Sequence, residues 1–575
     1  MSKRAAPAPV SGVVEAGSST SGSTQSRARS WWDVHLDLVV LVAASVLLAL
    51  PFIVLSHVNT IDGPAHVLGG RLLQSLHDAP VVRRYYHFTL AVPNVLVPLL
   101  LAAAMVVLSP TWAEKVVVAL YVVAFPLAVR YAIRSVNREA GWLALIGLPL
   151  VVSYLLLFGF YDFSYAMVGA FVAIGLAIRF RGNWSLLRVM ALALVLALTY
   201  GAHVVPAVMA VVVIGTLTVV DALSAWRRRG AVSGGTGVSG GTGVSGGSVG
   251  RVVLPPLLAS LPTAALTAAF VASGSAGGLE TQRKSFTTLV AGLATLTLPT
   301  VTYSDFEIVG AVAVVVILLV LCVVALFDLR MRQTSTLAVG LLVATFVCVV
   351  VYLAAPDDVG SGSYLNDRIC LFPPLVLLLA LASAPVRARA WRVAGTIGLL
   401  AALVAAGARL PTEVHYDHLV SEYLTVERAI PPGVTLLAVR YSVFSPPVGS
   451  RRYKQLDPLA HEASRIAADR GDIDLADFEA LVSFFPDQFR PGVKQLVTRD
   501  LYSSEVVPPR VELAQYNQAS GRPVQYVLIV GLKGATEQVR DNPDTLAVER
   551  VLAAHYQQVL VTHPTGLVTL YRYRS

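Results

Sequence analysis

Charged residues are scarce in this chain, and their scarcity excludes an ordinary soluble globular protein. Only 14% of its 575 residues are Asp, Glu, Lys or Arg, whereas 55% are hydrophobic, and the mean hydropathy is +0.67. The apolar residues gather in repeated runs of about 20, the length needed to cross the hydrocarbon core of a bilayer. The sequence therefore predicts a polytopic membrane protein built mainly from α-helices.

Cysteine is also rare, and the excess of positive charge is not arranged for nucleic acid. The three cysteines, Cys322, Cys348 and Cys370, fall within or at the edge of apolar runs, so they indicate neither a disulfide framework nor a metal knuckle. The formal charge of +9 comes from short basic clusters between apolar runs, as expected of signals that set membrane topology. We therefore expect no nucleic-acid partner.

Composition divides the chain into three parts. Residues 1–34 are rich in Ser, Gly, Ala and Pro and predict a disordered cytoplasmic tail, because they lack the apolar core of a signal peptide. Residues 35–410 carry the apolar runs, interrupted at 230–250 by a Gly/Ser linker. Residues 411–575 have the composition of a soluble α/β domain.

The basic clusters decide which apolar runs are counted as spans. A full span at 94–108 would place every later arginine cluster outside the cell, against the positive-inside rule. That segment is short and contains Pro98, so we expect a re-entrant or surface helix on the outer side, and likewise at 286–303. The remaining spans, about eleven by this rule, lie roughly at 36–56, 116–134, 142–158, 161–180, 186–202, 204–226, 252–272, 307–328, 335–354, 368–384 and 393–409.

This topology predicts a multi-pass protein of the cell membrane, with a cytoplasmic N-terminus and an extracytoplasmic C-terminal domain. Within that domain, strands are predicted at 434–440, 525–530, 558–562 and 567–573. Helices are predicted at 457–469, where Asp457 precedes a proline, and at 544–555.

The loop after the first span contains the first candidate residues. Asp62-Gly63-Pro64 is typical of a helix start, and the following helix has an apolar face that can lie on the membrane. In one interpretation, Asp62 has no role other than to cap this helix. Alternatively, a partly desolvated carboxylate at the interface can accept the proton of an acceptor hydroxyl. His66 follows on the same helical face and is a candidate to bind the substrate.

Two further outer turns carry polar groups at the ends of spans. Asp162 stands in an aromatic hairpin, where a carboxylate is costly unless it has a partner or a function, although it can also cap the next span. His203 can contact a phosphate or can be a satisfied interfacial histidine. Asp62, His66 and His203 include ligand types of divalent cations, but their spacing forms no strong metal motif, and no other cofactor is expected.

Two other outer loops supply cations. Arg283 and Lys284 precede the segment 286–303, and Asp367-Arg368 stands directly before the tenth span. Because arginine can bind a phosphate with two parallel hydrogen bonds, these residues are candidates to hold the phosphate or pyrophosphate of a lipid carrier. Arg368 can instead be an interfacial anchor that is neutralised by Asp367.

The order of a first span, an acidic outer loop, surface helices and a second acidic hairpin resembles the GT-C superfamily of membrane glycosyltransferases. In particular it resembles the protein O-mannosyltransferase and aminoarabinose-transferase type, and also uncharacterised bacterial multispan proteins of that shape, and the resemblance covers residues 35–410 in layout. The resemblance implies a polyprenyl-phosphate sugar as donor. It also implies that Asp62 matches the first-loop acid, which acts as base or positions the acceptor, and that Asp162 matches the second acid.

The chain departs from this family at two points. Many members carry two adjacent acids in the first loop, whereas Gly63 follows Asp62 here. Many also hold the carrier phosphate with a lysine, for which His203 or Arg368 would have to substitute.

Two functions follow from the sequence. The first is a glycosyltransferase that moves a sugar from a polyprenyl-phosphate-linked donor to a hydroxyl of a cell-envelope glycan, lipid or protein, with Asp62 as base. The second is a transporter, or a non-catalytic multispan protein that carries an external binding domain. The polar candidates lie at the outer ends of spans instead of in mid-span, which favours the first function.

Overall fold

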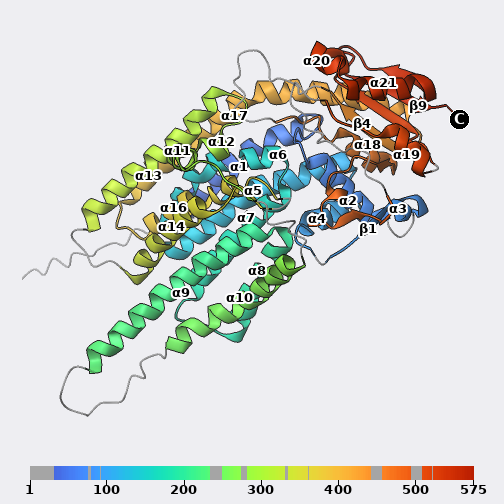
Figure 1. Ribbon diagram of the computed structural model, residues 1–575. Helices are drawn as coiled ribbons and strands as arrows, with labels where there is room; N and C mark the ends of the chain where they lie inside the picture. Colours follow the sequence, from blue (N-terminus) through green and yellow to red (C-terminus); the bar gives the residue numbers. More distant parts are fainter. Residues whose placement is uncertain are drawn as a thin grey trace, which may run out of the picture.

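The computed structural model describes residues 31–75, 79–90, 92–233, 249–273, 281–329, 335–359, 362–441, 456–493, 508–520 and 522–574. Most of the predicted tail at 1–34 and of the predicted linker at 230–250 lies outside these ranges. The described chain forms a bundle of long helices with a smaller domain of helices and strands at one end (Figure 1).

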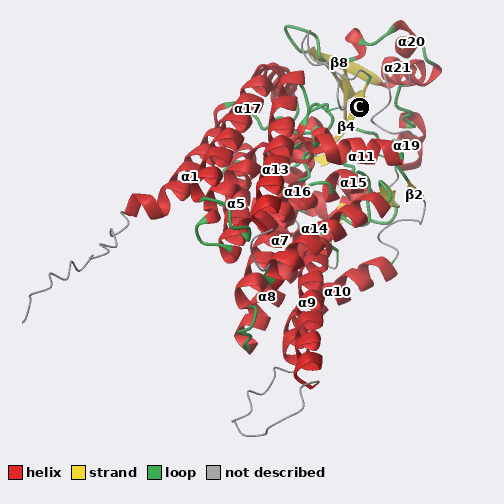
Figure 2. Cartoon of the chain, turned by 90° about the vertical axis from the view of Figure 1, so that its left-hand side faces the viewer, coloured by secondary structure: helices red, strands yellow, loops and turns green. Residues whose placement is uncertain are grey.

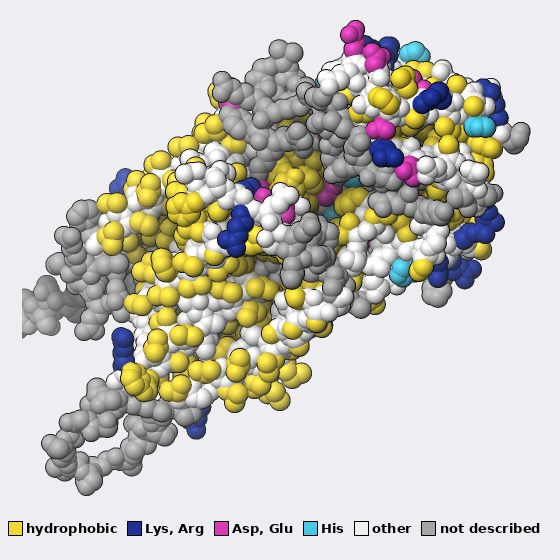
Figure 3. Space-filling model, in the orientation of Figure 1, with side chains coloured by type: hydrophobic (Ala, Val, Ile, Leu, Met, Phe, Trp, Pro, Cys, Tyr) yellow, Lys and Arg dark blue, Asp and Glu magenta, His cyan; other side chains and the backbone are white. Residues whose placement is uncertain are grey.

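The length of the helices and the apolar surface of the bundle are those of a multi-pass membrane protein. Among the described residues, nine helical segments are long and apolar enough to cross a bilayer. Large hydrophobic side chains such as Val54, Leu254 and Leu319 are exposed on them, and the surface of the bundle is mostly apolar (Figure 3). These segments contain α1 (Trp31–Val54), α5 (Pro110–Val136), α7 (Tyr161–Phe180), α9 (Val204–Ser233), α10 (Val249–Ala272), α13 (Ile308–Leu329), α14 (Thr336–Ala354), α15 (Leu365–Ile369) together with α16 (Phe372–Ala382), and α17 (Ala388–Leu424), and the bundle also contains the shorter helix α8 (Leu186–Ala202).

Two of the predicted spans fall on shorter segments. The span at 186–202 is α8, which has 17 residues. The span at 142–158 is the 3₁₀-helix η1 (Ala140–Leu150), a bend, and the short helix α6 (Tyr154–Phe158). The prediction of one regular helix at 142–158 is therefore wrong.

This interrupted segment nevertheless reaches from the first turns of α1 to the loop that follows α1. A side chain at Gly141 would overlap Asp37, which forms an ion pair with Arg130 at 2.9 Å near the start of α1. At the other end, the carbonyl of Phe158 accepts a hydrogen bond from the backbone N–H of Asp62. A 3₁₀-helix rises about 2 Å per residue, so fewer residues cover the distance than in an α-helix.

The two segments predicted not to span are short helices. Residues 94–108 contain α4 (Leu96–Ala104), and residues 286–303 contain α11 (Phe286–Thr295) and α12 (Thr297–Thr300). The other short elements between the long helices are α2 (Gly63–Ser75), α3 (Pro80–Tyr85), β1 (Tyr86–Phe88), β2 (Thr281–Gln282), η2 (Asp305–Glu307), β3 (Asp358–Val359) and α15 (Leu365–Ile369).

The C-terminal domain is built on a mixed five-stranded sheet, seen at the top of Figure 2. Its strand order is β5-β4-β7-β9-β8, with β4 parallel to β5 and β7, and β9 antiparallel to β7 and β8. In the central register, Val439 pairs with Ile529, and Ile529 with Thr569. The elements of the domain are η3 (Thr425–Ala429), β4 (Thr435–Arg440), α18 (Glu462–Arg470), β5 (Ile473–Asp474), η4 (Glu479–Leu481), β6 (Asp487–Phe489), α19 (Leu513–Ser520), β7 (Tyr526–Val530), η5 (Leu532–Gly534), α20 (Glu537–Arg540), α21 (Pro543–His555), β8 (Tyr556–Val561) and β9 (Val568–Tyr573).

All four predicted strands of this domain are confirmed, and so is the helix predicted at 544–555. The helix predicted at 457–469 starts later, because residues from Asp457 to His461 form a turn before α18. Asp457 accepts the backbone N–H of Leu459 at 3.0 Å in that turn.

The domain packs directly on the first loop of the bundle. Strand β1 pairs antiparallel with β6, so that Tyr86 lies opposite Phe489. Helix α2 packs between α4 and α18, and its residues from Gly63 to Gly70 are buried. The prediction that this helix lies on the membrane is therefore wrong, because protein covers both of its faces.

Gly159 is required where the hairpin before α7 approaches the first loop. Its φ of +102° is in the region that only glycine occupies easily, and a Cβ there would lie 2.6 Å from the backbone nitrogen of Asp62. The backbone N–H of Ile61 also donates to Leu157 at 3.3 Å. The two chain segments are therefore in backbone contact at Asp62.

We predict that Gly159→Ala lowers the free energy of unfolding by about 3 kcal/mol, because it adds a steric overlap to the cost of a left-handed backbone. Thermal unfolding in detergent would measure the loss. Gly182→Ala is the matched control: its φ is +72°, but no atom lies within 4 Å of the added Cβ, so it should cost only about 1 kcal/mol. Equal losses for the two variants would contradict the proposed overlap.

Candidate functional site

A cavity of about 350 Å³ lies between the bundle and the C-terminal domain. Five of the residues predicted from the sequence line it: Asp62, His66, Asp162, His203 and Arg368. They come from the first loop, α2, the start of α7, the turn between α8 and α9, and α15. The volume is in the range of sites that bind small molecules.

Asp62 is held by its backbone while part of its carboxylate has no partner. Its carbonyl accepts the N–H groups of Ala65 at 3.0 Å and His66 at 3.1 Å, which starts α2. Its Oδ1 is buried without a hydrogen-bond partner among the described residues and lies 3.7 Å from Nε2 of His461. The main chain of Asp62 therefore starts the helix, and this carboxylate oxygen remains available for chemistry.

Gly63 explains why a second acid cannot follow Asp62. A side chain at this position would overlap Thr60, Glu114 and Tyr161. Those three side chains are joined to each other: Tyr161 Oη lies 2.6 Å from Thr60 Oγ1 and donates to Glu114 Oε1 at 2.9 Å. The departure from a double-acid loop is thus imposed by packing.

Asp162 and His66 fix the wall of the cavity on the bundle side. Asp162 Oδ1 accepts the backbone N–H of Val97 at 3.2 Å, while its Oδ2 lies 3.7 Å from His66 Nδ1. His66 Nε2 donates to the carbonyl of Gly159 at 2.9 Å, and its Nδ1 lies 2.8 Å from Glu479 Oε1. Since Nε2 carries a proton, the contact with Glu479 needs a second proton on either partner.

His203 and Arg368 are suited to an anionic group. His203 Nδ1 accepts the N–H of Val205 at 3.1 Å, so the neutral ring carries its proton on Nε2. The guanidinium of Arg368 stacks on Phe160, 4.3 Å from the ring centroid. Its Nε is buried and has no hydrogen-bond partner among the described residues, which leaves a donor for a ligand.

The remaining predicted residues lie apart from this cavity. Lys284 forms ion pairs with Asp357 at 3.0 Å and with Asp367 at 3.1 Å. Arg283 is exposed beside the short strand β2. None of Arg283, Lys284 and Asp367 is among the lining residues, although Asp367 is next to Arg368 in the chain.

The C-terminal domain supplies a wall of the cavity that the sequence did not predict. Its lining residues are Arg440, Asp457, Phe478, Val482, Phe484 and Phe485. Arg440 and Asp457 form a buried ion pair. Two adjacent phenylalanines, Phe484 and Phe485, are recognisable in the sequence as a buried or ligand-contacting segment. Their place beside Asp62 depends on long-range packing, which the local sequence does not predict.

Burial changes the protonation of groups around the cavity. It raises the pKa of Asp62 from its usual 3.8 to about 7, while His66 and Arg368 limit the rise. Burial also lowers the pKa of His461 to about 3, so this ring is neutral. The pKa of Glu479 is well above its usual value because it is buried near Asp487, Asp162 and Asp62.

A buried ion cluster joins the C-terminal domain to the bundle beside this site. Arg465 of α18 contacts Glu114 of α5 at 2.5 Å and Glu462 at 2.8 Å, and all three side chains are fully buried. Arg465 also donates to the carbonyl of Val58 at 3.3 Å. The same Glu114 accepts from Tyr161, so the cluster positions the first loop and α7 together.

Asp62, His66 and His203 line one cavity but are not placed as a set of metal ligands. Within the described ranges, no group of three or more His, Cys, Asp or Glu side chains is arranged to hold a metal ion.

No protein-family model matches the chain, and no curated protein matches it.

We predict that Arg465→Leu lowers the free energy of unfolding by about 3–5 kcal/mol, because Glu114 and Glu462 lose their shared cation in a buried site. Thermal unfolding in detergent would report the change. Arg470→Leu in the same helix is the control, since Arg470 is only half-buried and donates to the carbonyl of Ile430. Similar losses for both variants would show that the buried charge is not the cause.

Proposed function

We propose that the protein is a membrane glycosyltransferase that moves a sugar from a polyprenyl-phosphate-linked donor to a hydroxyl acceptor, with Asp62 as general base. The observation that carries the proposal is the meeting of Asp62, Asp162, His203 and Arg368 in one cavity between the bundle and the C-terminal domain. These residues are spread over 306 positions of the chain, from Asp62 to Arg368. Packing of apolar helices alone would not bring their polar side chains together.

The chemistry requires a base, a cation for the leaving group and an enclosed site. The acceptor oxygen would attack the anomeric carbon while Asp62 takes its proton, and the bond from that carbon to the phosphate oxygen would break. Arg368, with His203 as a second donor, would stabilise the departing polyprenyl phosphate. One displacement of this kind inverts the anomeric centre.

The other residues around the cavity have positioning roles in this proposal. Asp162 binds the start of α4 through Val97 and lies beside His66, so it holds these elements around Asp62. Arg440 and the phenylalanines Phe478 and Phe485 would contact the acceptor from the C-terminal domain. The acceptor is then a glycan, lipid or protein hydroxyl of the cell envelope that reaches this domain.

The direct test replaces Asp62 with asparagine, which keeps the shape of the side chain and removes the base. In proteoliposomes supplied with polyprenyl-phosphate hexoses and pentoses and an envelope extract as acceptor, we expect Asp62→Asn to reduce transfer by about 100-fold or more. Asp305→Asn, at an exposed aspartate outside the cavity, is the control and should transfer normally. Undiminished transfer by Asp62→Asn would refute the base assignment.

Folding of the asparagine variant can be checked independently. Because the pKa of Asp62 is raised in the folded protein, ionisation of this carboxyl above about pH 4 disfavours the folded state. Asp62→Asn should therefore be at least as stable as the parent at pH 8. A lower melting temperature would show that lost transfer reflects damage to the fold.

The pH dependence gives a separate prediction. A base must be ionised, and the pKa of Asp62 is about 7, so transfer should fall as the pH decreases through about 7. Arg368→Gln removes a charge that lowers this pKa, so the midpoint should move to higher pH while transfer weakens. The control is Arg84→Gln, an exposed arginine of the first loop, which should keep the midpoint. A rate profile that is flat from pH 6 to 8 would contradict the assignment.

A further inference from the structure

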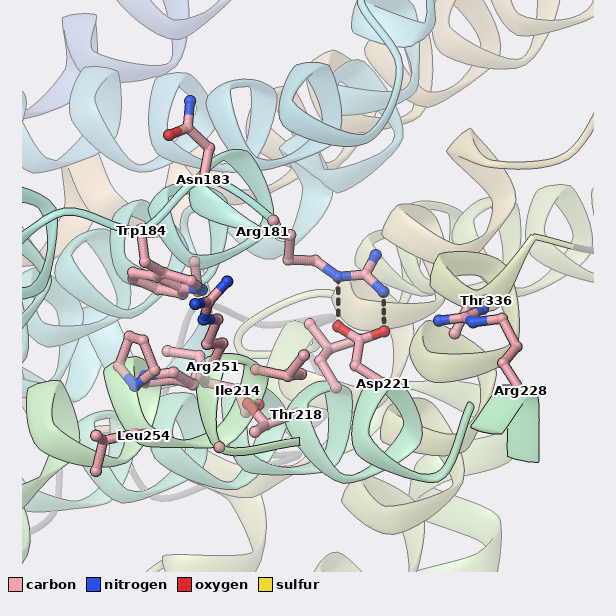
Figure 4. Close-up of a pocket in the computed structure, with 17 residues that line it drawn as sticks. Arg181, Asn183, Trp184, Ile214, Thr218, Asp221, Arg228, Arg251, Leu254 and Thr336 are labelled. Atoms are coloured by element: carbon pink, nitrogen blue, oxygen red, sulfur yellow. Dashed lines mark hydrogen bonds and ion pairs between the residues drawn. The ribbon is translucent and has the colours of Figure 1, made fainter. Parts of the chain in front are cut away.

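The polar groups of two cavities differ in how they are paired. The larger cavity, of about 1060 Å³, lies at the end of the bundle away from the C-terminal domain, and there Arg181 and Asp221 bind each other through two hydrogen bonds (Figure 4). Within the described part of the chain, no residue that lines the larger cavity has a buried side-chain polar atom without a hydrogen-bond partner. Such atoms do occur in the lining of the smaller cavity, on Asp62, Asn94, Asp162 and Arg368. The smaller cavity is therefore the one arranged for a polar ligand.

Asn94 is the member of this set that has no part in the proposed reaction as described so far. It lies in the loop before α4 and is buried, with 5% of its surface exposed. Its Nδ2 donates to the carbonyl of Phe484 at 3.5 Å, so the nitrogen side of the amide faces the C-terminal domain. Its Oδ1 has no partner among the described residues. A buried carbonyl oxygen in this state costs free energy, which a hydroxyl group of a ligand would recover.

The backbone at Asn94 does not account for the choice of asparagine. Its φ of +63° is in the left-handed region, which asparagine tolerates better than most residues. However, Leu296 and Tyr364 adopt the same region with φ of +52° and +62°, so this conformation does not require an asparagine in this chain. Tyr364 lines the same cavity as Asn94. Backbone held in a sparsely populated region in the wall of a cavity is typical of binding sites.

The loop at Asn94 is fixed to the part of the cavity where the proposed reaction places the phosphate. The backbone N–H of Val95 donates to the carbonyl of Gly201 at 2.8 Å, two residues before His203. Asn94 is thus joined to the turn of His203 through its neighbour, and to Phe484 through its own side chain. In the proposed reaction His203 donates to the phosphate of the carrier, and the group attached to that phosphate is the sugar.

We propose that Asn94 binds a ring hydroxyl of the donor sugar and thereby selects the sugar. The hydroxyl group donates a hydrogen bond to Oδ1 of Asn94. This inference rests on the function proposed for the cavity, because it takes the sugar to be attached to a phosphate beside His203 and Arg368. A sugar that lacks this hydroxyl, or holds it on the other face of the ring, leaves Oδ1 unpaired and binds more weakly.

The test separates binding of the sugar from binding of the phosphate. The ligands are the methyl ester of a short polyprenyl phosphate and the hexosyl and pentosyl esters of the same phosphate, which all carry one negative charge. Their affinities for the full-length protein in detergent are measured by titration calorimetry. We expect Asn94→Gly to weaken the best-bound sugar ester about fivefold and to leave the methyl ester unchanged. Arg368→Gln should weaken both ligands by the same factor, because it acts on the phosphate.

Glycine is the informative replacement, because it adopts the left-handed backbone without a steric cost and removes only the carboxamide. The melting temperature of Asn94→Gly should therefore stay close to that of the parent. Asn137→Gly is the matched control, since Asn137 also donates to a carbonyl, that of Ala382 at 3.1 Å, but lines neither cavity. It should bind both ligands as the parent does.

Deoxy sugars provide a second measurement. Among the single-deoxy forms of the best-bound ester, one should bind the parent about fivefold more weakly than the full sugar, and it should bind Asn94→Gly as tightly as the full sugar does. Equal weakening of the methyl and sugar esters in Asn94→Gly, or a parent in which no single hydroxyl matters, would overturn the role of Asn94 and leave the proposed function standing. A parent that binds none of these phosphate esters would refute the proposed function and this inference together.

Discussion

The structure around the candidate site depends on one buried cation. Arg465 comes from the C-terminal domain, and its partner Glu114 comes from α5 of the bundle, so their contact at 2.5 Å crosses the boundary between the two parts. Neither charge has access to water, and each would be strongly unfavourable there without the other. Glu114 in turn binds Tyr161, and Arg465 binds the carbonyl of Val58. The segments before Asp62 and Asp162 are thus held by the same pair of ions.

Two glycines allow this arrangement to close. Gly63 leaves room for the Thr60, Glu114 and Tyr161 side chains, and Gly159 lets the hairpin before α7 reach the backbone of Asp62. The result is a carboxylate on a loop whose backbone is hydrogen-bonded at Ile61 and Asp62, and such bonds help to place a side chain accurately. Asp62 was predicted from its place at a helix start after the first span, and the glycine that follows it is explained by local packing.

Part of this architecture could be predicted from local sequence, and part could not. Hydropathy and alternation identify the long helices and the strands β4, β7, β8 and β9, because those signals depend on near neighbours in the chain. The 3₁₀-helix at Ala140–Leu150 is missed because an apolar run looks the same in either kind of helix. Placing the polar ends of spans on one side predicted the gathering of Asp62, Asp162, His203 and Arg368. It could not predict Arg440 or Phe485, which reach the site only through the docking of the C-terminal domain.

That docking makes the C-terminal domain part of the environment of the Asp62 carboxylate. An exposed aspartate has a pKa near 4 and is a poor base, whereas burial holds the pKa of Asp62 at about 7. Residues of the domain stand over this carboxylate: His461 lies 3.7 Å from its Oδ1, and Phe478 and Phe485 line the same cavity. His461 is itself uncharged, so it does not offset the desolvation. A chain without this domain would keep Asp62 but would return its carboxyl to water and to an ordinary pKa.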